Sequence, residues 1–328
     1  MLQDTISRQR TVRSIKINST IALLVALVLM CIVFGVLSPT FLSAANLYTI
    51  TNTLAIVGIS AIGMTLVLIS GGVDLSVGST AALTGAVVSG LWPNVLPIWE
   101  AVLVGLLAGT LVGLFNGLII TRLHISPLIT TLATYSAVRG IAFLVPSAHD
   151  HQLNDPGFVY LGRGSIGGIP FSFLLTLVLY LVFYFVLRNS QFGRNLYAIG
   201  GSPEAARLAG ININMHLVIA YVLCALLSSL SGLISSAQLA AGRPEAATGL
   251  EFTVIAAVVL GGTSLTGGKG TLIGTLIGVV LLRTLDNGLI QLSVSSFFQD
   301  VARGVVLLLT VGIDQLRIQW ERARQRGT

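Results

Sequence analysis

The segment LISGGVDLSVGST, residues 68–80, places a carboxylate within one of the most apolar stretches of the chain. Asp74 follows Gly71 and Gly72, and Ser76 comes two residues later. A charged side chain near the centre of a membrane-spanning helix costs about 3 kcal/mol. Such a carboxylate either acts on a proton, an ion or a substrate, or accepts backbone N–H bonds where a helix begins.

A second polar segment could carry metal chemistry. His149-Asp150-His151, with Asp155 nearby, has side chains that bind metals, but a metal site fixes three or four ligands. Two histidines in a flexible stretch are more typical of a solvated outer loop, so no metal site is predicted. The sparse polar residues supply no nucleophile, base and orienting group, so the chain is not predicted to be an enzyme.

Gly268-Lys269 has the glycine and lysine of a phosphate-binding P-loop. That motif requires a glycine five residues before its second glycine, and a serine or threonine after the lysine. Thr263 and Gly270 occupy those two positions, so the motif fails at both ends. ATP binding by this device is not predicted, and neither is any cofactor.

The elements that hold these residues follow from the composition. Charged residues are 9% of the 328 residues, against a typical quarter, and hydrophobic residues are 54%. Apolar stretches near the spanning length of about 20 residues recur from end to end. The chain is therefore predicted to be an all-α polytopic membrane protein in contact with the lipid bilayer. Its net charge of +6 is explained by orientation in the membrane, and nucleic acid is not predicted as a partner.

About ten transmembrane helices are predicted in a domain at 20–316, between tails at 1–19 and 317–328. The basic first tail resembles a signal peptide, but the many spans that follow indicate an uncleaved first helix. The eighth and ninth spans are short. The expected spans are Thr20–Leu37, Ile50–Ser70, Leu75–Trp92, Ala101–Ile120, Pro127–Val145, Phe171–Leu187, Leu217–Ile234, Thr248–Gly261, Thr271–Leu285 and Val301–Leu316.

The basic residues predict the orientation of these spans. With the N-terminus in the cytoplasm, most of the 18 lysines and arginines fall in the two tails and the inner loops. The outer loops, such as 146–170, then carry only Arg163 and Arg243. Because positive charge favours the cytoplasmic side, both termini are predicted to be cytoplasmic.

Glycine recurs every four residues in two of the spans. The positions are Gly105, Gly109, Gly113 and Gly117 in the fourth span, and Gly270, Gly274 and Gly278 in the ninth. Such a repeat lines one helix face, where a second helix can approach closely. Packing within one subunit is favoured over a subunit interface. The fourth and ninth spans are five apart, which agrees with two five-helix inverted halves, an arrangement common in transporters.

A second internal similarity disagrees with inversion. GGVDLSVGST at 71–80 resembles GGTSLTGGKG at 261–270, yet both follow even-numbered spans and so share one orientation. Both stretches break hydrophobic helices with glycine, which is tolerated at membrane depth only against protein or a water-filled cavity. Paired breaks of this kind indicate a substrate path. The residues predicted for the path or the breaks are Gly71, Gly72, Asp74, Ser76, Glu251, Gly261 and Gly262.

The longest polar segment between spans is 189–214, and it predicts a short helix. Ser202 suits an N-cap, Pro203 the first helical position and Glu204 the positive end of the helix dipole. Ala205, Ala206, Arg207 and Leu208 continue this helix, and Gly210 can end it. A helix this short is unstable alone in water. Its weak apolar face disfavours attachment to lipid, so docking to a protein is the preferred interpretation.

The chain resembles the ribose-type sugar permeases of bacterial ABC importers, within the ribose and branched-chain amino acid permease superfamily. The resemblance runs from about Leu37 to Gly312, and NGLIQL at 287–292 also contributes. Three long motifs carry it in the correct order: AIGMTLVLISGGVDLSVGS (61–79), FGRNLYAIGGSPEAARLAGININ (192–214) and AAVVLGGTSLTGGKGTLIGTLIG (256–278). Before the third motif the family usually has ELDAIAA, whereas this chain reads EFTVIAA, so Thr253 replaces a common aspartate.

The resemblance implies a permease domain in the bacterial inner membrane that passes ribose or a related monosaccharide. Two permease subunits, identical or paralogous, would form one pathway. A separate cytoplasmic ATP-binding subunit would supply energy, and a periplasmic or lipid-anchored binding protein would supply the sugar. Segment 189–214 would be the coupling loop, with Ser202–Leu208 docking the ATPase.

Asp74 can be interpreted in two ways within this frame. A neutral sugar needs no buried charge, so a cap at the start of the third span is preferred to direct contact with substrate. The alternative is a single-chain ion-coupled secondary transporter in which Asp74 carries a proton or sodium ion. That alternative needs no docking loop, so segment 189–214 counts against it.

Overall fold

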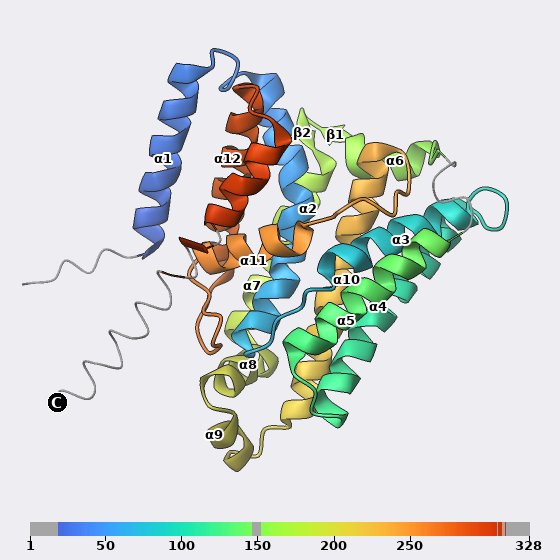
Figure 1. The fold of residues 1–328 in the computed structure, drawn as a ribbon, viewed down its shortest axis with the longest axis vertical. Coiled ribbons are helices and arrows are strands. Elements are labelled where there is room, and N and C mark those ends of the chain that lie inside the picture. Colours follow the sequence, from blue (N-terminus) through green and yellow to red (C-terminus); the bar gives the residue numbers. More distant parts are fainter. Residues whose placement is uncertain (1–18, 146–151, 307, 310–311, 313–328) are drawn as a thin grey trace, which may run out of the picture.

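The chain folds into a bundle of helices, and the computed structural model describes residues 19–145, 152–306, 308–309 and 312. Apart from Ser19, the predicted tails at 1–19 and 317–328 lie outside the described residues, as does His149-Asp150-His151. Residues 296–306 form a helix that carries no label in Figure 1. The labelled elements are α1 (Ser19–Leu37), α2 (Ala44–Ile69), α3 (Val77–Leu91), α4 (Ile98–Arg122), α5 (Pro127–Leu144), α6 (Pro156–Arg163), β1 (Ser165–Ile166), β2 (Ile169–Pro170), α7 (Phe171–Asn189), α8 (Gln191–Gly201), α9 (Pro203–Leu208), α10 (Ile213–Leu239), α11 (Leu250–Leu260) and α12 (Leu272–Gln291).

Among the residues that the structure describes, six helices are long and apolar enough to cross a membrane, namely α2, α4, α5, α7, α10 and α12. Within the described residues, three shorter apolar helices accompany them at Ile21–Leu37, Val77–Leu91 and Leu250–Leu260. The prediction of an all-α polytopic membrane protein is therefore confirmed. The count of ten crossings stays a prediction.

Helices α2 and α10 form the interior of the bundle. In the most apolar stretch of α2, 83% of the residues are buried, against 22% in α7. α10 packs against α2, α3 and α4, and α12 packs against α2 and α11. A helix that is apolar all round belongs inside a bundle, whereas α5 and α7 leave leucine and phenylalanine side chains exposed, as a lipid-facing helix does.

Two of the apolar helices are too short to cross the membrane core. α3 has 15 residues and α11 has 11, which at about 1.5 Å per residue span roughly three quarters and roughly half of a core about 30 Å thick. Each follows a non-helical segment, 70–76 before α3 and 240–249 before α11. Gly249 begins α11 with a φ of +78°, which favours glycine. The eighth predicted span, α11, is short as predicted. The ninth, α12, is not short, since it has 20 residues, and the short α3 was predicted as an ordinary span.

The ninth predicted span, Thr271–Leu285, is too short by six residues, because α12 continues to Gln291. Asp286 and Asn287 resemble a polar helix end in the sequence, but both are buried. Asp286 pairs with two arginines and Asn287 exchanges side-chain hydrogen bonds with Asn46, so the helix continues through them. The tenth predicted span, which starts at Val301, starts too late, because the last helix already includes residue 296.

The predicted outer loop at 146–170 contains structure in its described part. Asp155 caps α6 by accepting a bond from the Phe158 N–H at 2.9 Å, and Pro156 holds the first helical position. The ring of Phe158 is fully buried against Leu153 and Ile98. Figure 1 shows α6 and the β1–β2 turn at the end of the molecule opposite α8 and α9.

Candidate functional site

The turn between α2 and α3 is organised by Asp74. Its Oδ1 accepts the Ser76 N–H at 2.9 Å and the Ser76 hydroxyl at 2.6 Å. Ser76 holds the N-cap position of α3 but its own side chain caps no N–H. Asp74 therefore orders the turn that enters α3, and its bond goes to the N-cap residue rather than to the first helical turn. Both residues are buried, as the sequence interpretation placed them.

Several elements hold this turn in place. Asn116 of α4 donates from Nδ2 to the Ser76 hydroxyl at 3.0 Å. The hydroxyl of Tyr221 in α10 donates to the carbonyl of Val73 at 3.2 Å, and that of Thr131 in α5 does so at 3.4 Å. The helix break is thus packed against protein, as non-helical backbone at this depth requires. Asn116 was not predicted as a site residue. The repeat of NGLI at 116–119 and 287–290, which begins at Asn116, was a signal that could have identified it.

Asp74 and Asn116 each have one side-chain oxygen that accepts no hydrogen bond among the described residues. Oδ2 of Asp74 and Oδ1 of Asn116 have no hydrogen-bond partner by geometry among the described residues. The thiol of Cys224, fully buried in α10, lies close enough to interact with the Asp74 carboxyl group. This small polar centre lies beside the hydrophobic core cluster to which Cys224 and Tyr221 belong.

The two similar glycine segments meet in space. The Gly268 N–H donates to the carbonyl of Ile69, the last residue of α2, at 2.9 Å. A Cβ added at Gly267 would lie 2.9 Å from Cα of Gly71 and 3.0 Å from Cα of Gly200. Backbone thus packs on backbone where the ends of α2 and α8 meet the 261–271 loop. We call this contact of Ile69, Gly71, Gly200, Gly267 and Gly268 the glycine junction.

Helix α8 connects this junction to the short helix α9. Its Tyr197 hydroxyl donates to the Gly270 carbonyl at 2.8 Å, and burial raises the pKa of Tyr197, which keeps that donor protonated. Asn195 bonds the His216 ring of α10 at 2.9 Å. Leu196 and Ile199 are buried. Helix α8 was not predicted, because its three glycines disfavour a helix in isolation.

Helix α9 spans Pro203–Leu208 and has the predicted local signals. Ser202 accepts the Ala205 N–H at 3.3 Å, and Gly210 follows the helix with a φ of +77°. Arg207 and Glu204 form an exposed ion pair at 2.7 Å. Ala206 is buried, whereas Leu208 is 78% exposed. Figure 1 shows α9 at the tip of the molecule, beyond the end of α8.

The first turns of α3 and α11 touch each other. A Cβ added at Gly78 would collide with the Glu251 carboxylate and lie 2.5 Å from the Ala247 carbonyl oxygen. Arg139 of α5 donates to the carbonyls of Pro244 and Ala246, at 2.6 and 2.8 Å, and so holds the segment before α11. Oε2 of Glu251 has no hydrogen-bond partner among the described residues. Arg139 was not singled out in the sequence.

The seven predicted path residues do not form a single site. Gly71 belongs to the glycine junction and Gly72 packs on the Tyr221 hydroxyl. Gly261 and Gly262 follow the end of α11, with Gly261 against the backbone of Gly274. Glu251 begins α11, so about 15 Å of helix separates it from Gly261. Glu251 therefore lies at the opposite end of α11 from Gly261 and Gly262.

The glycine repeats lie on packed faces. Added Cβ atoms would meet α3 at Gly105 and α10 at Gly109, Gly113 and Gly117. In the second repeat, Gly274 and Gly278 of α12 pack against Gly261 and Ala257 at the end of α11. The prediction that Gly270 shares their helix face is wrong, because Gly270 precedes α12; a Cβ added there would lie 2.6 Å from the Thr263 hydroxyl oxygen. These contacts are all inside one chain.

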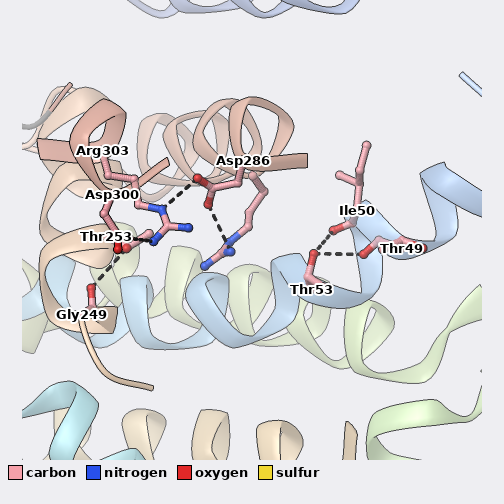
Figure 2. A network of polar contacts seen from close by, with 9 residues as sticks. Thr49, Ile50, Thr53, Gly249, Thr253, Asp286, Asp300 and Arg303 are labelled. Carbon is pink, nitrogen blue, oxygen red and sulfur yellow. Dashed lines mark hydrogen bonds and ion pairs between the residues drawn. The ribbon is translucent and has the colours of Figure 1, made fainter. Parts of the chain in front are cut away.

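A network of charged side chains lies beside the start of α11 and was missed in the sequence. Asp286 of α12 binds Arg283 at 3.3 Å and Arg303 at 3.0 Å, and Arg303 also binds Asp300 at 2.8 Å (Figure 2). Thr253 of α11 donates its hydroxyl to the Gly249 carbonyl at 3.2 Å. The spacing of Arg283 with Asp286 and of Asp300 with Arg303 suits i,i+3 ion pairs, but the contact of Asp286 with Arg303 joins two different helices and gives no signal in the sequence.

Comparison with known proteins covers most of the chain. A sequence profile described as "Branched-chain amino acid transport system / permease component" matches residues 46–311. Ribose import permease protein RbsC of Escherichia coli (strain K12) is 40% identical over 295 residues, which are 89% of this chain and 92% of that protein. RbsC of Bacillus subtilis (strain 168) is 39% identical over 291 residues, 88% of this chain and 90% of that protein.

The chain is also similar to a permease that is named for another sugar. The L-arabinose ABC transporter permease protein AraH of Azospirillum brasilense is 38% identical over 295 residues, which are 89% of this chain and 87% of that protein. No solved structure matches the chain significantly. The names of these relatives differ in the sugar, so the resemblance identifies the class of substrate, a sugar, but not which sugar.

Proposed function

Because the chain belongs to the branched-chain amino acid transport system / permease component family, we propose that it passes ribose or a related monosaccharide across the membrane. It is a permease subunit of a sugar ABC importer, and such subunits transport rather than catalyse. The family implies an ATP-binding partner and a substrate-binding partner. The similarity to ribose permeases along 89% of the chain carries the proposal for the sugar.

The proposal is tested with the whole transporter. Proteoliposomes that contain the chain and its ATP-binding subunit, with the sugar-binding protein outside and ATP inside, should take up labelled D-ribose. They should not do so when ATP is omitted from the inside. We expect no uptake without the binding protein. If D-ribose, L-arabinose and other monosaccharides all fail to enter under these conditions, the sugar class is wrong.

The ATP-binding subunit docks on α9 in this proposal. Residues Ser202–Leu208 present an exposed ion pair and an exposed leucine at the tip of the molecule. A six-residue helix is unstable alone, and the packing of α8 against the bundle holds this one in position. A displacement of α9 would reach the glycine junction through α8, and from there both glycine segments.

We further propose two inverted five-helix halves. NGLI occurs near the C-terminal end of α4 and again near that of α12, the fourth and ninth expected spans. The short helices α3 and α11 are also five expected spans apart, and their first turns meet. Inverted repeats with interrupted helices that meet inside the membrane are common in transporters.

The orientation proposed is the predicted one, with both termini on the cytoplasmic side of the bacterial inner membrane. Arg122, Arg188 and Arg194 lie at or next to the ends of α4 and α7, and Arg207 lies on α9. Positive charge favours that side. A second permease subunit, identical or paralogous, completes the pathway in this proposal.

The ion-coupled alternative is tested at Asp74. Asparagine keeps the Oδ1 atom that accepts the Ser76 N–H and hydroxyl, whereas alanine leaves both donors unsatisfied in a buried turn, at a cost of about 1–3 kcal/mol. We therefore expect substantial uptake with Asp74→Asn and a lower melting temperature in detergent with Asp74→Ala. ATP-driven uptake should persist after the proton gradient is collapsed, with ATP kept available.

The opposite pattern would favour the secondary transporter. Asparagine cannot titrate near neutral pH, so a proton carrier would be inactive as Asp74→Asn although folded. Loss of wild-type uptake on collapse of the gradient, in vesicles replete with ATP, would make Asp74 the coupling group.

A further inference from the structure

The structure assigns a sugar-contact site to a pocket with a charged wall at the start of α11, an inference that rests on the proposed function. The pocket lies between the first turn of α11 and the helix at 296–306, and its cavity volume is about 420 Å³. Small-molecule pockets typically have about 300–1,000 Å³. It is lined by Thr248, Gly249, Phe252, Thr253, Asp300, Arg303 and Gly304.

The pocket lies within the depth of the membrane. Asp286, which Arg303 binds, is five residues before the last residue of α12, so it lies about 7–8 Å along the helix from that end. Figure 1 shows α11 beside the middle part of the long helix α2. The pocket is therefore neither on the cytoplasmic face nor at the outer surface.

Its charges are too exposed to face lipid. The side chain of Asp300 is 69% exposed and that of Arg303 is 35% exposed in this chain. Each would cost about 2.5–3.5 kcal/mol against hydrocarbon, so intramembrane charges face protein or a water-filled cavity. An exposed carboxylate and guanidinium at this depth thus indicate the wall of an aqueous path.

The chemistry of the lining suits a hydroxylated, uncharged ligand. Arg303 is held by Asp286 through Nε and by Asp300 through Nη1, which leaves Nη2 to donate (Figure 2). Asp300 can accept from sugar hydroxyls, since a carboxylate has about four acceptor positions. The charges beside the pocket form two neutral pairs, Arg303 with Asp300 and Arg283 with Asp286. The pocket therefore has no excess charge that would select an ion.

An aromatic face completes the pocket. The ring of Phe252 is 55% exposed beside the charged pair. Such a ring can pack against the C–H face of a sugar while the polar groups bind its hydroxyls. Thr253 is buried next to the cavity, and because its hydroxyl hydrogen is used by the Gly249 carbonyl, its oxygen can only accept.

The test uses the assembled transporter in proteoliposomes, with D-ribose and L-arabinose as probes. Asp300→Asn, Phe252→Leu and Thr253→Val are each compared with wild type for ATP-driven uptake. The matched controls are Phe185→Leu, an exposed ring on α7, and Thr110→Val, whose hydroxyl also bonds the carbonyl four residues earlier.

We expect the pocket variants to lower the maximal uptake rate, by on the order of tenfold for Asp300→Asn. The ratio of ribose to arabinose uptake should also change, because the two sugars differ in the direction of their hydroxyls. KM should stay near that of wild type, since the binding protein captures the sugar. Both controls should behave as wild type does.

Two results would overturn the inference. Unchanged rates and an unchanged sugar ratio in all three pocket variants would mean that the sugar does not contact the pocket. Equal loss for both sugars, together with loss of paired permease subunits on gel filtration, would make the pocket a subunit contact. Failure of the proposed function itself would look different, because then the wild-type transporter would take up neither sugar.

Discussion

Exchange of the two charges on α9, with Glu204→Arg and Arg207→Glu in one chain, is expected to abolish ATP-driven sugar uptake. The exchange keeps an oppositely charged i,i+3 pair, so the helix itself retains its ion pair and its Ser202 cap. What changes is the charge pattern offered to a partner. Like charges placed opposite each other cost several kcal/mol, so uptake should fall by at least about tenfold.

The matched control keeps the charges and changes only the side-chain length. Glu204→Asp with Arg207→Lys should retain uptake and co-purification of the ATP-binding subunit. The exchanged variant should reach the membrane in normal amounts but lose that subunit on purification. Normal uptake and normal co-purification in the exchanged variant would exclude α9 as the docking helix.

Gly113→Leu is expected to produce the largest loss of stability. A Cβ at this position would lie 2.5 Å from the Ala225 Cβ and collide with the backbone carbonyl of Tyr221, both in α10. Backbone cannot yield as a flexible side chain does, so the cost should reach or exceed the about 1–3 kcal/mol typical of overpacked cores. The melting temperature in detergent and the amount of protein in the membrane measure the effect.

Gly140→Leu is the matched control for this substitution. Gly140 is also a helical glycine, on α5, and an added Cβ there meets no described atom within 4 Å. We expect this variant to accumulate as wild type does. A stable and active Gly113→Leu protein would mean that α4 and α10 do not pack as the structure describes.

The sequence predicted the spans well because hydropathy reports burial in lipid or in a bundle equally. α5 begins at Pro127 as expected, and α9 has the bounds that Ser202, Pro203 and Gly210 indicate. These are local signals, in which each residue acts on its own helix end. They need no knowledge of what packs nearby.

The failures occurred where tertiary contacts override local signals. Asp286 and Asn287 suggested a helix end, but partners from other segments satisfy both inside the membrane. α8 forms despite its glycines because Gly200 allows the close backbone contact of the glycine junction. Asn116 and Arg139 could not be recognised, since their partners lie 40 and about 105 residues away along the chain.

The structure explains why the glycine segments 71–80 and 261–270 resemble each other. Their likeness predicted paired helix breaks along a substrate path. In the structure parts of both segments touch the same end of α8, so a shared packing requirement explains the glycines without common descent. The exact NGLI repeat, which does suggest common descent of two halves, is short and was passed over.

The pairing of Arg303 with Asp286 has a consequence for biosynthesis. When α12 enters the membrane, the helix at 296–306 has not yet entered, and Asp286 has only Arg283, one turn earlier on its own helix, as a partner. The second ion pair can form only after the following helix has entered. A chain truncated before Arg303 would keep Asp286 and Arg283 without that pairing, and because an incompletely paired charge is costly in the membrane, we expect such a chain to accumulate less than the full chain does.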